Sequence, residues 1–152
     1  MNRSAALLLA TWFGAGRMPV APGTWGSLAA LPCAAVIVWL GGHVALALAA
    51  LIVFAIGCWA SAAATDEKDP GYIVIDEVAA QFLVLVAAPL DWRAYAVGFA
   101  LFRLFDIWKP PPIRRVERAV PGGLGIMLDD VIAAIYALVL LVIGEGALGA
   151  RF

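Results

Sequence analysis

The feature that most constrains this chain is a stretch of 48 residues, 18–65, in which no side chain is charged apart from the titratable His43. A helix needs about 20 apolar residues to cross the hydrocarbon core of a bilayer, so the stretch is long enough for two crossings. The "GGH" at residues 41–43 is the natural turn between them, and residues 44–64 form the best single span. A buried helical hairpin in a soluble domain is the alternative. It is disfavoured because a chain of 152 residues cannot bury so much apolar surface by itself.

The rest of the chain is also unusually apolar. Hydrophobic residues make up 64% of it and charged residues 14%, with a mean hydropathy of +0.97, whereas soluble domains have about 25% charged residues. We therefore predict an all-α fold, a multi-helix integral membrane bundle in which residues 1–152 form a single domain. The expected helices are 26–40, 44–65, 77–88, 94–106 and 129–144.

Two details of this topology stay open. The third and fourth helices are short, so each either crosses at a tilt or joins its neighbour in a hairpin that turns at "PLDWR", residues 89–93. Residues 4–13 predict a short helix on the membrane surface. A signal peptide is the alternative for the start of the chain, although the context for cleavage is poor.

The charged residues are distributed unevenly between the two ends of the predicted helices. Counting crossings from a cytoplasmic N-terminus places eight of the ten Lys and Arg residues on or next to one side, together with nine of the eleven acids. The basic residues predict that this side is cytoplasmic. The same rule does not explain the acids, so we predict a polar site at the cytoplasmic helix ends. The residues on this side are Arg3, Arg17, Lys68, Arg103, Lys109, Arg114, Arg115 and Arg118, with Asp66, Glu67, Asp69, Asp76, Glu77, Asp106, Glu117, Asp129 and Asp130.

Two pairs of adjacent acids lie where apolar runs begin: Asp76 and Glu77, and Asp129 and Asp130. Carboxylates at a helix start can cap free backbone N–H groups, which is one interpretation of both pairs. The other is that acids from two helix mouths surround a hard cation such as Mg²⁺, which prefers carboxylate, water and phosphate oxygens. Adjacent helical residues point about 100° apart, so one acid of each pair could face the bundle while the other caps the helix or faces the headgroups.

A third acidic position lies near the end of the fourth predicted helix. Arg103 and Asp106 are three residues apart on one helical face, and Lys109 follows before a proline. Ionisable residues at membrane depth indicate function by default. The alternative is an ion pair that extends to the interface.

Two further segments could contact anions. The Pro- and Gly-rich stretch at residues 16–32 places Arg17 and Thr24 just before an apolar helix, where free N–H groups can bind an anion. It lacks the spacing of a P-loop. The basic stretch at residues 110–118 predicts a solvated belt that attracts anionic lipid, formed by Arg114, Arg115 and Arg118.

Several classes of protein are disfavoured by the residues present. Cys33 and Cys58 lie in apolar runs without a CxxC or a cysteine–x5–arginine loop, so they are interpreted as packing residues. His43 is the single histidine and lies on the predicted far side, which argues against a histidine phosphatase or a Ser-His-Asp triad. The net charge of −1 gives no indication of nucleic-acid binding.

Four motifs, taken in order, resemble those of the phosphatidylglycerophosphatase A family. They are "APGTWGSL" (21–28), "IVIDEVAAQF" (73–82), "FRLFDIWKPPPIR" (102–114) and "GGLGIMLDDVIA" (122–133), and the resemblance runs along most of the chain. One departure is Ala80, where a glycine is expected in many relatives. The resemblance implies a helical enzyme of the bacterial inner membrane, and the count of crossings and basic residues predicts that it is multi-pass with its site facing the cytoplasm. It would remove the terminal phosphate of phosphatidylglycerophosphate with Mg²⁺, giving phosphatidylglycerol.

The resemblance also implies roles for the acidic positions, and a mechanistic hypothesis follows. The implied active-site residues are Asp76, Glu77, Asp106, Asp129 and Asp130. Some of four acids would hold the Mg²⁺, which would bind the phosphate and activate water or orient the attacking group: Asp76, Glu77, Asp129 and Asp130. The candidate substrate-binding residues are Arg17, Thr24, Arg103 and Lys109. Attack by water and a phospho-aspartate intermediate both stay open.

The expected partners are phosphatidylglycerophosphate in the bilayer and anionic lipids. Two rival interpretations are a non-catalytic membrane scaffold and a small ion-coupled transporter. The scaffold leaves the two acid pairs unexplained. The transporter is disfavoured because an ion path needs polar groups across the whole membrane depth, and the far halves of the apolar helices have almost none.

Overall fold

The computed structural model describes residues 3–65 and 70–148. These residues form helices and connecting turns, without a strand among them, so the predicted all-α class is confirmed. The elements are α1 (Arg3–Ala10), the 3₁₀ helix η1 (Ala15–Arg17), α2 (Pro22–Ala64), α3 (Ile75–Leu85), α4 (Trp92–Trp108), α5 (Ile113–Ala119) and α6 (Gly122–Leu148).

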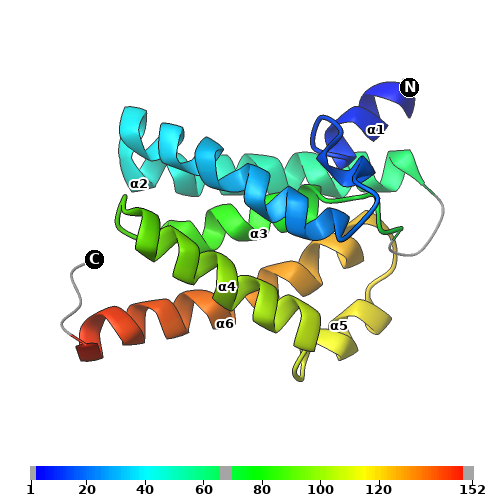
Figure 1. The fold of residues 1–152 in the computed structure, drawn as a ribbon. Helices are drawn as coiled ribbons and strands as arrows, with labels where there is room; N and C mark the ends of the chain where they lie inside the picture. Colours follow the sequence, from blue (N-terminus) through cyan, green and yellow to red (C-terminus); the bar gives the residue numbers. More distant parts are fainter. Residues whose placement is uncertain (1–2, 66–69, 149–152) are drawn as a thin grey trace.

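Helix α2 is a hairpin of two antiparallel arms. It is interrupted at Gly42, whose φ of 73° and ψ of −175° lie outside the helical region. Figure 1 shows the two arms side by side, with the turn at the end of the bundle far from α1. Each arm of about 20 residues is about 30 Å long, which matches the hydrocarbon core. The predicted turn at residues 41–43 is confirmed.

Helix α3 is the centre of the bundle. It packs against α2, α4 and α6, and nine of its eleven residues are buried. Its buried side chains include Phe82 and Leu85, which join Leu46 of α2 and Phe102 of α4 in one core. With eleven residues, α3 is about 16 Å long, much shorter than the hydrocarbon core. A polar residue at its first turn is therefore held inside the bundle.

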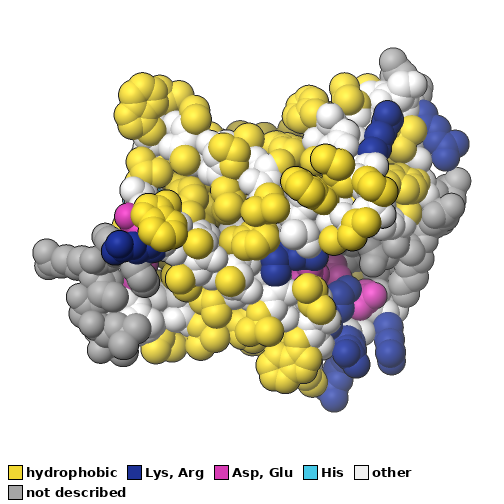
Figure 2. Space-filling view, viewed as in Figure 1, with side chains coloured by type: hydrophobic (Ala, Val, Ile, Leu, Met, Phe, Trp, Pro, Cys, Tyr) yellow, Lys and Arg dark blue, Asp and Glu magenta, His cyan; other side chains and the backbone are white. Residues whose placement is uncertain are grey.

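The outside of the bundle is apolar, in contrast to a soluble domain. Large hydrophobic side chains such as Trp39, Val44, Ile107 and Ile143 are exposed, and apolar groups cover most of the face in Figure 2. Helices α2 and α6 are long and apolar enough to cross a bilayer, with mean hydropathies of 2.4 and 2.5 over their best windows. The fold is that of a membrane helical bundle.

The helix ends separate into two groups. The starts of α2, α3 and α6, the end of α4 and all of α5 lie at one end of the bundle, while the tip of α2 and the α3–α4 turn lie at the other (Figure 1). The first group contains the described charged segments that were predicted to share one side of the membrane. The predicted members Asp66, Glu67, Lys68 and Asp69 lie outside the described residues.

Several predicted helix bounds were wrong, including that of the first helix, which begins at Pro22 instead of residue 26. The last helix starts at Gly122 instead of residue 129, so Asp129 and Asp130 lie more than one turn inside α6. The short helix α5 occupies the basic stretch that was predicted only as a stiff segment and a belt. The third and fourth helices begin two residues earlier than predicted, at Ile75 and Trp92.

The turn at Gly42 gives a prediction for stability. The substitution Gly42→Ala should lower the free energy of unfolding by about 1–3 kcal/mol, because its backbone conformation is strained for any residue with a Cβ. The matched control is Gly144→Ala in α6, where a Cβ would meet no atom within 4 Å and alanine has the higher helix propensity. Unfolding in detergent micelles measures both. Equal stability of the two variants would contradict the strained turn.

Candidate active site

Three carboxylates from two helices form what we call the acidic cluster: Asp76 and Glu77 of α3, and Asp130 of α6. One oxygen of each lies within 4.8 Å of one oxygen of each of the others. Asp76 and Asp130 are 6% and 4% exposed, and the Glu77 side chain is 14% exposed. Asp76 Oδ1, Glu77 Oε2 and Asp130 Oδ2 are buried and accept no hydrogen bond from the described residues. Each of the three carboxylates therefore contributes an oxygen to one small space, and each also has a buried oxygen without a hydrogen-bond partner among the described residues.

The position of the cluster follows from how α3 starts. The Val74 N–H donates to the Ala10 carbonyl at the end of α1, 2.9 Å away, and the Val74 side chain packs where Gly26 of α2 has no Cβ. These contacts fix the first turn of α3 against α1 and α2. Asp76 and Glu77 thus lie at the N-terminal end of α3, where the helix dipole favours negative charge.

The capping interpretation is wrong for the second acid pair and holds in part for the first, because the backbone N–H of Glu77, in the first turn of α3, hydrogen-bonds to the Asp76 and Glu77 carboxylates. The N-cap position of α3 is Val74, without a side-chain cap, and Asp129 and Asp130 lie inside α6 rather than at its start. The suggestion that one acid of each pair faces outward also fails, since both Asp129 and Asp130 are buried. Asp76, Asp129 and Asp130 are buried within the bundle.

Two basic residues near the end of α4 connect the cluster to further acids. Arg103 is 2.6 Å from Asp106 and 3.7 Å from Glu77. Lys109 donates a hydrogen bond of 2.8 Å to Asp129 Oδ2 and lies 3.3 Å from Glu117. Each cation is therefore shared between two acids.

Lys109 is held firmly in its charged form. Burial alone would lower the pKa of its ammonium, but the hydrogen bond to Asp129 and the charges of Asp129 and Glu117 together raise the pKa above its usual value. Its backbone is in the left-handed region, with φ of 47°. This conformation ends α4 after Trp108, so the first residue beyond the helix, Lys109, is the one whose ammonium contacts α6.

The first turn of α2 also touches the cluster. A Cβ at Gly23 would collide with the Glu77 carboxylate and lie 3.3 Å from the Arg103 guanidinium. Gly23 therefore lets the backbone of α2 approach both groups. Thr24 is the next residue and is partly buried.

The structure brings most of the predicted site residues to one end of the bundle. Asp76, Glu77 and Asp130 form the cluster, and Arg103, Asp106, Lys109 and Asp129 form the ion pairs beside it. Figure 2 shows acidic and basic side chains together in a band between apolar surfaces. Arg17, in η1, lies at the same end but is exposed and is not part of the acidic cluster. Gly23 and Glu117 were missed as site residues. The signal for Gly23 was its place between Pro22 and Thr24 at a helix start.

A basic pocket of about 260 Å³ lies next to Lys109. Its lining includes Lys109, Pro110, Arg114 and Arg115. Arg114 donates to the Trp108 carbonyl at 3.3 Å. The exposed Arg114 and Arg115 agree with the predicted solvated belt.

The fold and the site together define a class: a helical membrane protein with an acidic site at one end of an apolar bundle. Residues 8–145 match the family described as phosphatidylglycerophosphatase A. The chain therefore belongs to the phosphatidylglycerophosphatase A family, and it is a phosphatase.

Three relatives illustrate this similarity. A phosphatidylglycerophosphatase A from Haemophilus influenzae is 43% identical over 136 residues, covering 87% of this chain and 83% of the relative. The protein of the same name from Escherichia coli K12 is 42% identical over 132 residues, covering 84% and 76%. A Bacteroides thetaiotaomicron protein, provisionally named a phosphatidylinositol-3-phosphatase, is 37% identical and covers 94% and 95%. No solved structure matches the chain.

The contact at Gly23 predicts a loss of activity without a large loss of stability. In Gly23→Ala, the added methyl should push the flexible Glu77 carboxylate out of the cluster and disturb Arg103. We expect phosphate release to fall at least tenfold, while the unfolding temperature changes little because the displaced atoms are at the end of a side chain. The control is Gly71→Ala, where the methyl would meet nothing within 4 Å. Equal activity of the two variants would show that Gly23 does not position Glu77.

Proposed function

We propose that this chain removes the terminal phosphate of phosphatidylglycerophosphate, in a Mg²⁺-dependent reaction at the acidic cluster. One water molecule is consumed as the phosphorus–oxygen bond to the lipid breaks, and the products are phosphatidylglycerol and inorganic phosphate. The observation that carries the proposal is the set of three buried carboxylate oxygens without partners, on Asp76, Glu77 and Asp130. The choice of substrate rests on the relatives that are named phosphatidylglycerophosphatase A.

The donor atoms suit Mg²⁺ in particular. They are all carboxylate oxygens, which are hard ligands, and the described part of the cluster contains no nitrogen or sulfur donor. Mg²⁺ is usually held by one or a few carboxylates together with water and substrate phosphate. Asp76, Glu77 and Asp130 would hold the ion. Bound there, it supplies a Lewis acid that offsets negative charge on the phosphate as the phosphorus–oxygen bond breaks.

The surrounding residues have separate roles in this proposal. Arg103 and Lys109 would bind and neutralise the phosphate oxygens, because phosphoryl transfer depends mainly on positioning and charge compensation. Asp106 holds the Arg103 guanidinium, and Asp129 with Glu117 holds the Lys109 ammonium. The two cations are therefore fixed before substrate binds.

The first turn of α2 would contribute on the remaining side. Gly23 allows its backbone to lie against Glu77, and Thr24 follows at the positive end of the helix dipole, where phosphate is favoured. We assign Arg17, which is exposed and close in the chain to Gly23, to contact with the outer part of the substrate headgroup. We assign Asp129 to the metal site as a residue that supports the three ligands.

An apolar groove supports a lipid substrate. It has a volume of about 330 Å³ and is lined from α2, α3 and α6. Two of its lining residues are close in the chain to the cluster, since Ala79 is one turn after Asp76 and Val131 follows Asp130. An acyl chain in this groove would extend from the site along the membrane depth. The site then lies at headgroup level, and the basic residues at that end favour the cytoplasmic leaflet of the bacterial inner membrane.

The belt of Arg114, Arg115 and Arg118 would also attract anionic lipids to this end. Each basic residue near a surface of anionic lipid contributes about 1 kcal/mol of attraction. The substrate is itself strongly anionic, so the same belt would raise its local concentration.

Amide substitutions test the assignment of the cluster. Asp76→Asn, Glu77→Gln and Asp130→Asn should each lower phosphate release at least 100-fold, because each removes a charged oxygen from the metal site. Their unfolding temperatures should stay equal or rise, since each change relieves repulsion between buried carboxylates. Glu145→Gln, in the far half of α6, is the control and should keep normal activity. Near-normal turnover of all three variants would mean that the reaction takes place elsewhere.

The metal and the substrate are tested with the same purified protein. Phosphate release from phosphatidylglycerophosphate in detergent should require Mg²⁺ and stop with a chelator. Phosphatidylinositol-3-phosphate is the comparison substrate, because one relative is provisionally named for it. Faster release from that lipid would overturn the substrate and keep the site, and chelator-resistant release would overturn the metal.

A further inference from the structure

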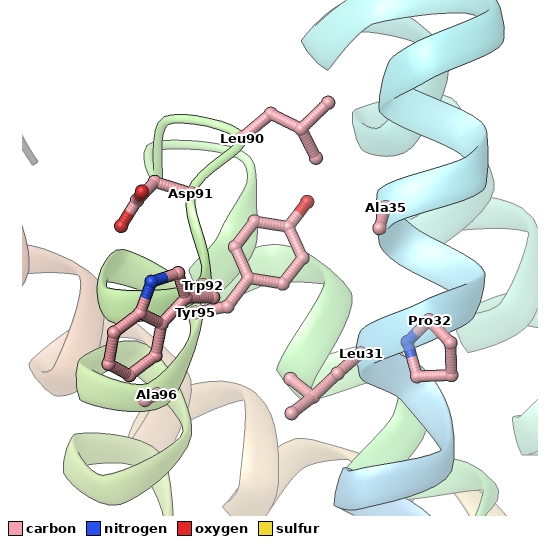
Figure 3. Close-up of a pocket in the computed structure, with 8 residues that line it drawn as sticks. All are labelled: Leu31, Pro32, Ala35, Leu90, Asp91, Trp92, Tyr95 and Ala96. Carbon is pink, nitrogen blue, oxygen red and sulfur yellow. The ribbon is translucent and has the colours of Figure 1, made fainter.

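A second pocket lies at the end of the bundle opposite the acidic cluster. It is formed between the first arm of α2 and the start of α4, and its volume is about 360 Å³. Its walls are mostly apolar, with Leu31, Pro32, Ala35 and Ala96 among the lining residues (Figure 3). Nothing in the proposed reaction uses this pocket.

One polar group is directed into it. Tyr95 is only 7% exposed, and its hydroxyl has no hydrogen-bond partner among the described residues. Figure 3 shows this hydroxyl pointing between Leu90 and Ala35. A buried polar group without a partner destabilises a fold, so the arrangement suits a ligand that accepts a hydrogen bond and is otherwise apolar.

The depth of Tyr95 indicates what that ligand is. Asp91 caps α4 by accepting a hydrogen bond of 2.8 Å from the Arg93 N–H. The polar turn between α3 and α4 therefore lies at the depth of Asp91. Tyr95 is one turn further in, about 6 Å along the helix. The polar layer on each side of the hydrocarbon core is also about 5–8 Å thick. The hydroxyl therefore lies where polar headgroups give way to acyl chains, which is the level of the ester carbonyls of a phospholipid.

The rim of the pocket is typical of a membrane interface. Trp92 is 73% exposed, and the Arg93 guanidinium lies 5.4 Å from the centre of its ring. Exposed tryptophan and arginine next to a polar turn are the usual anchors at headgroup level. Arg93 also provides a positive charge beside the pocket for a lipid phosphate.

We propose that this pocket binds one phospholipid from the leaflet opposite the acidic cluster. One acyl chain lies between α2 and α4, and an ester carbonyl accepts a hydrogen bond from the Tyr95 hydroxyl. The site is separate from the substrate site because the two are at opposite ends of the bundle.

Paired lipids isolate this hydrogen bond. The full-length protein in detergent is titrated with dioleoyl phosphatidylethanolamine or with its dialkyl ether analogue, which has the same headgroup but no carbonyl. Native mass spectrometry counts the bound lipid. Wild-type protein should retain the ester lipid about fivefold more tightly than the ether lipid, as expected for one hydrogen bond. In Tyr95→Phe the two lipids should bind equally, and Ala96→Trp, which fills the pocket from its exposed edge, should weaken both.

Folding and activity serve as controls. Both variants should release phosphate at the wild-type rate, which shows that they are folded and that the acidic site is untouched. An unchanged preference for the ester lipid in Tyr95→Phe, or no preference in the wild type, would overturn the proposal. If Tyr95→Phe does not fold, Tyr95→Trp takes its place. Because tryptophan keeps an aromatic hydrogen-bond donor, this variant should fold and keep part of the preference for the ester lipid. Equal binding of both lipids to a folded Tyr95→Trp would count against it.

Discussion

The structure at the acidic-cluster end of the bundle depends on holding several carboxyl groups close together away from bulk water. Asp76, Glu77 and Asp130 share one small space, and carboxylates at such distances repel one another strongly where solvent screening is weak. The fold offsets this repulsion from several directions. The start of α3 supplies its helix dipole, and Arg103 contacts Glu77. A divalent cation held by these three carboxylates would complete the compensation.

The two basic residues lie beside the acidic cluster and do not pair with all of its carboxylates. Arg103 and Lys109 are each divided between two acids, so neither cancels the charge of the three-carboxylate cluster. Arg103 and Lys109 instead hold positive charge in a fixed position at the edge of the acidic cluster. A phosphate that approaches a bound cation would meet these groups already in place, without reorganising them. Such preorganised charge contributes most to reactions in which charge moves during bond breaking.

How much of this could be predicted from the sequence varied with the kind of signal. The α2 turn was predictable because a glycine pair interrupts a long apolar run. Counting the membrane crossings predicted that most of the acids lie at the same end of the bundle. The start of α6 was not, since "GGLG" is typical of a turn. In the structure Gly123 and Gly125 are helical, and the absence of side chains lets them pack against Cys58 and Val120. Tertiary packing overrode local propensity there. Helix α5 was missed because seven residues are too few to show a period.

The missed role of Gly23 shows why contacts between distant segments cannot be read from motifs one at a time. An aspartate side chain is short, so carboxylates from α3 and α6 can meet only if the backbones that support them are close. Small residues make such approach possible in membrane bundles. Gly26 accommodates Val74 just before the acidic turn of α3, and Gly123 brings the start of α6 against the second arm of α2. Gly23 then allows α2 to reach Glu77 itself. The geometry of the acids is therefore set by glycines in other motifs, so substituting one of these glycines changes the site as directly as substituting an acid.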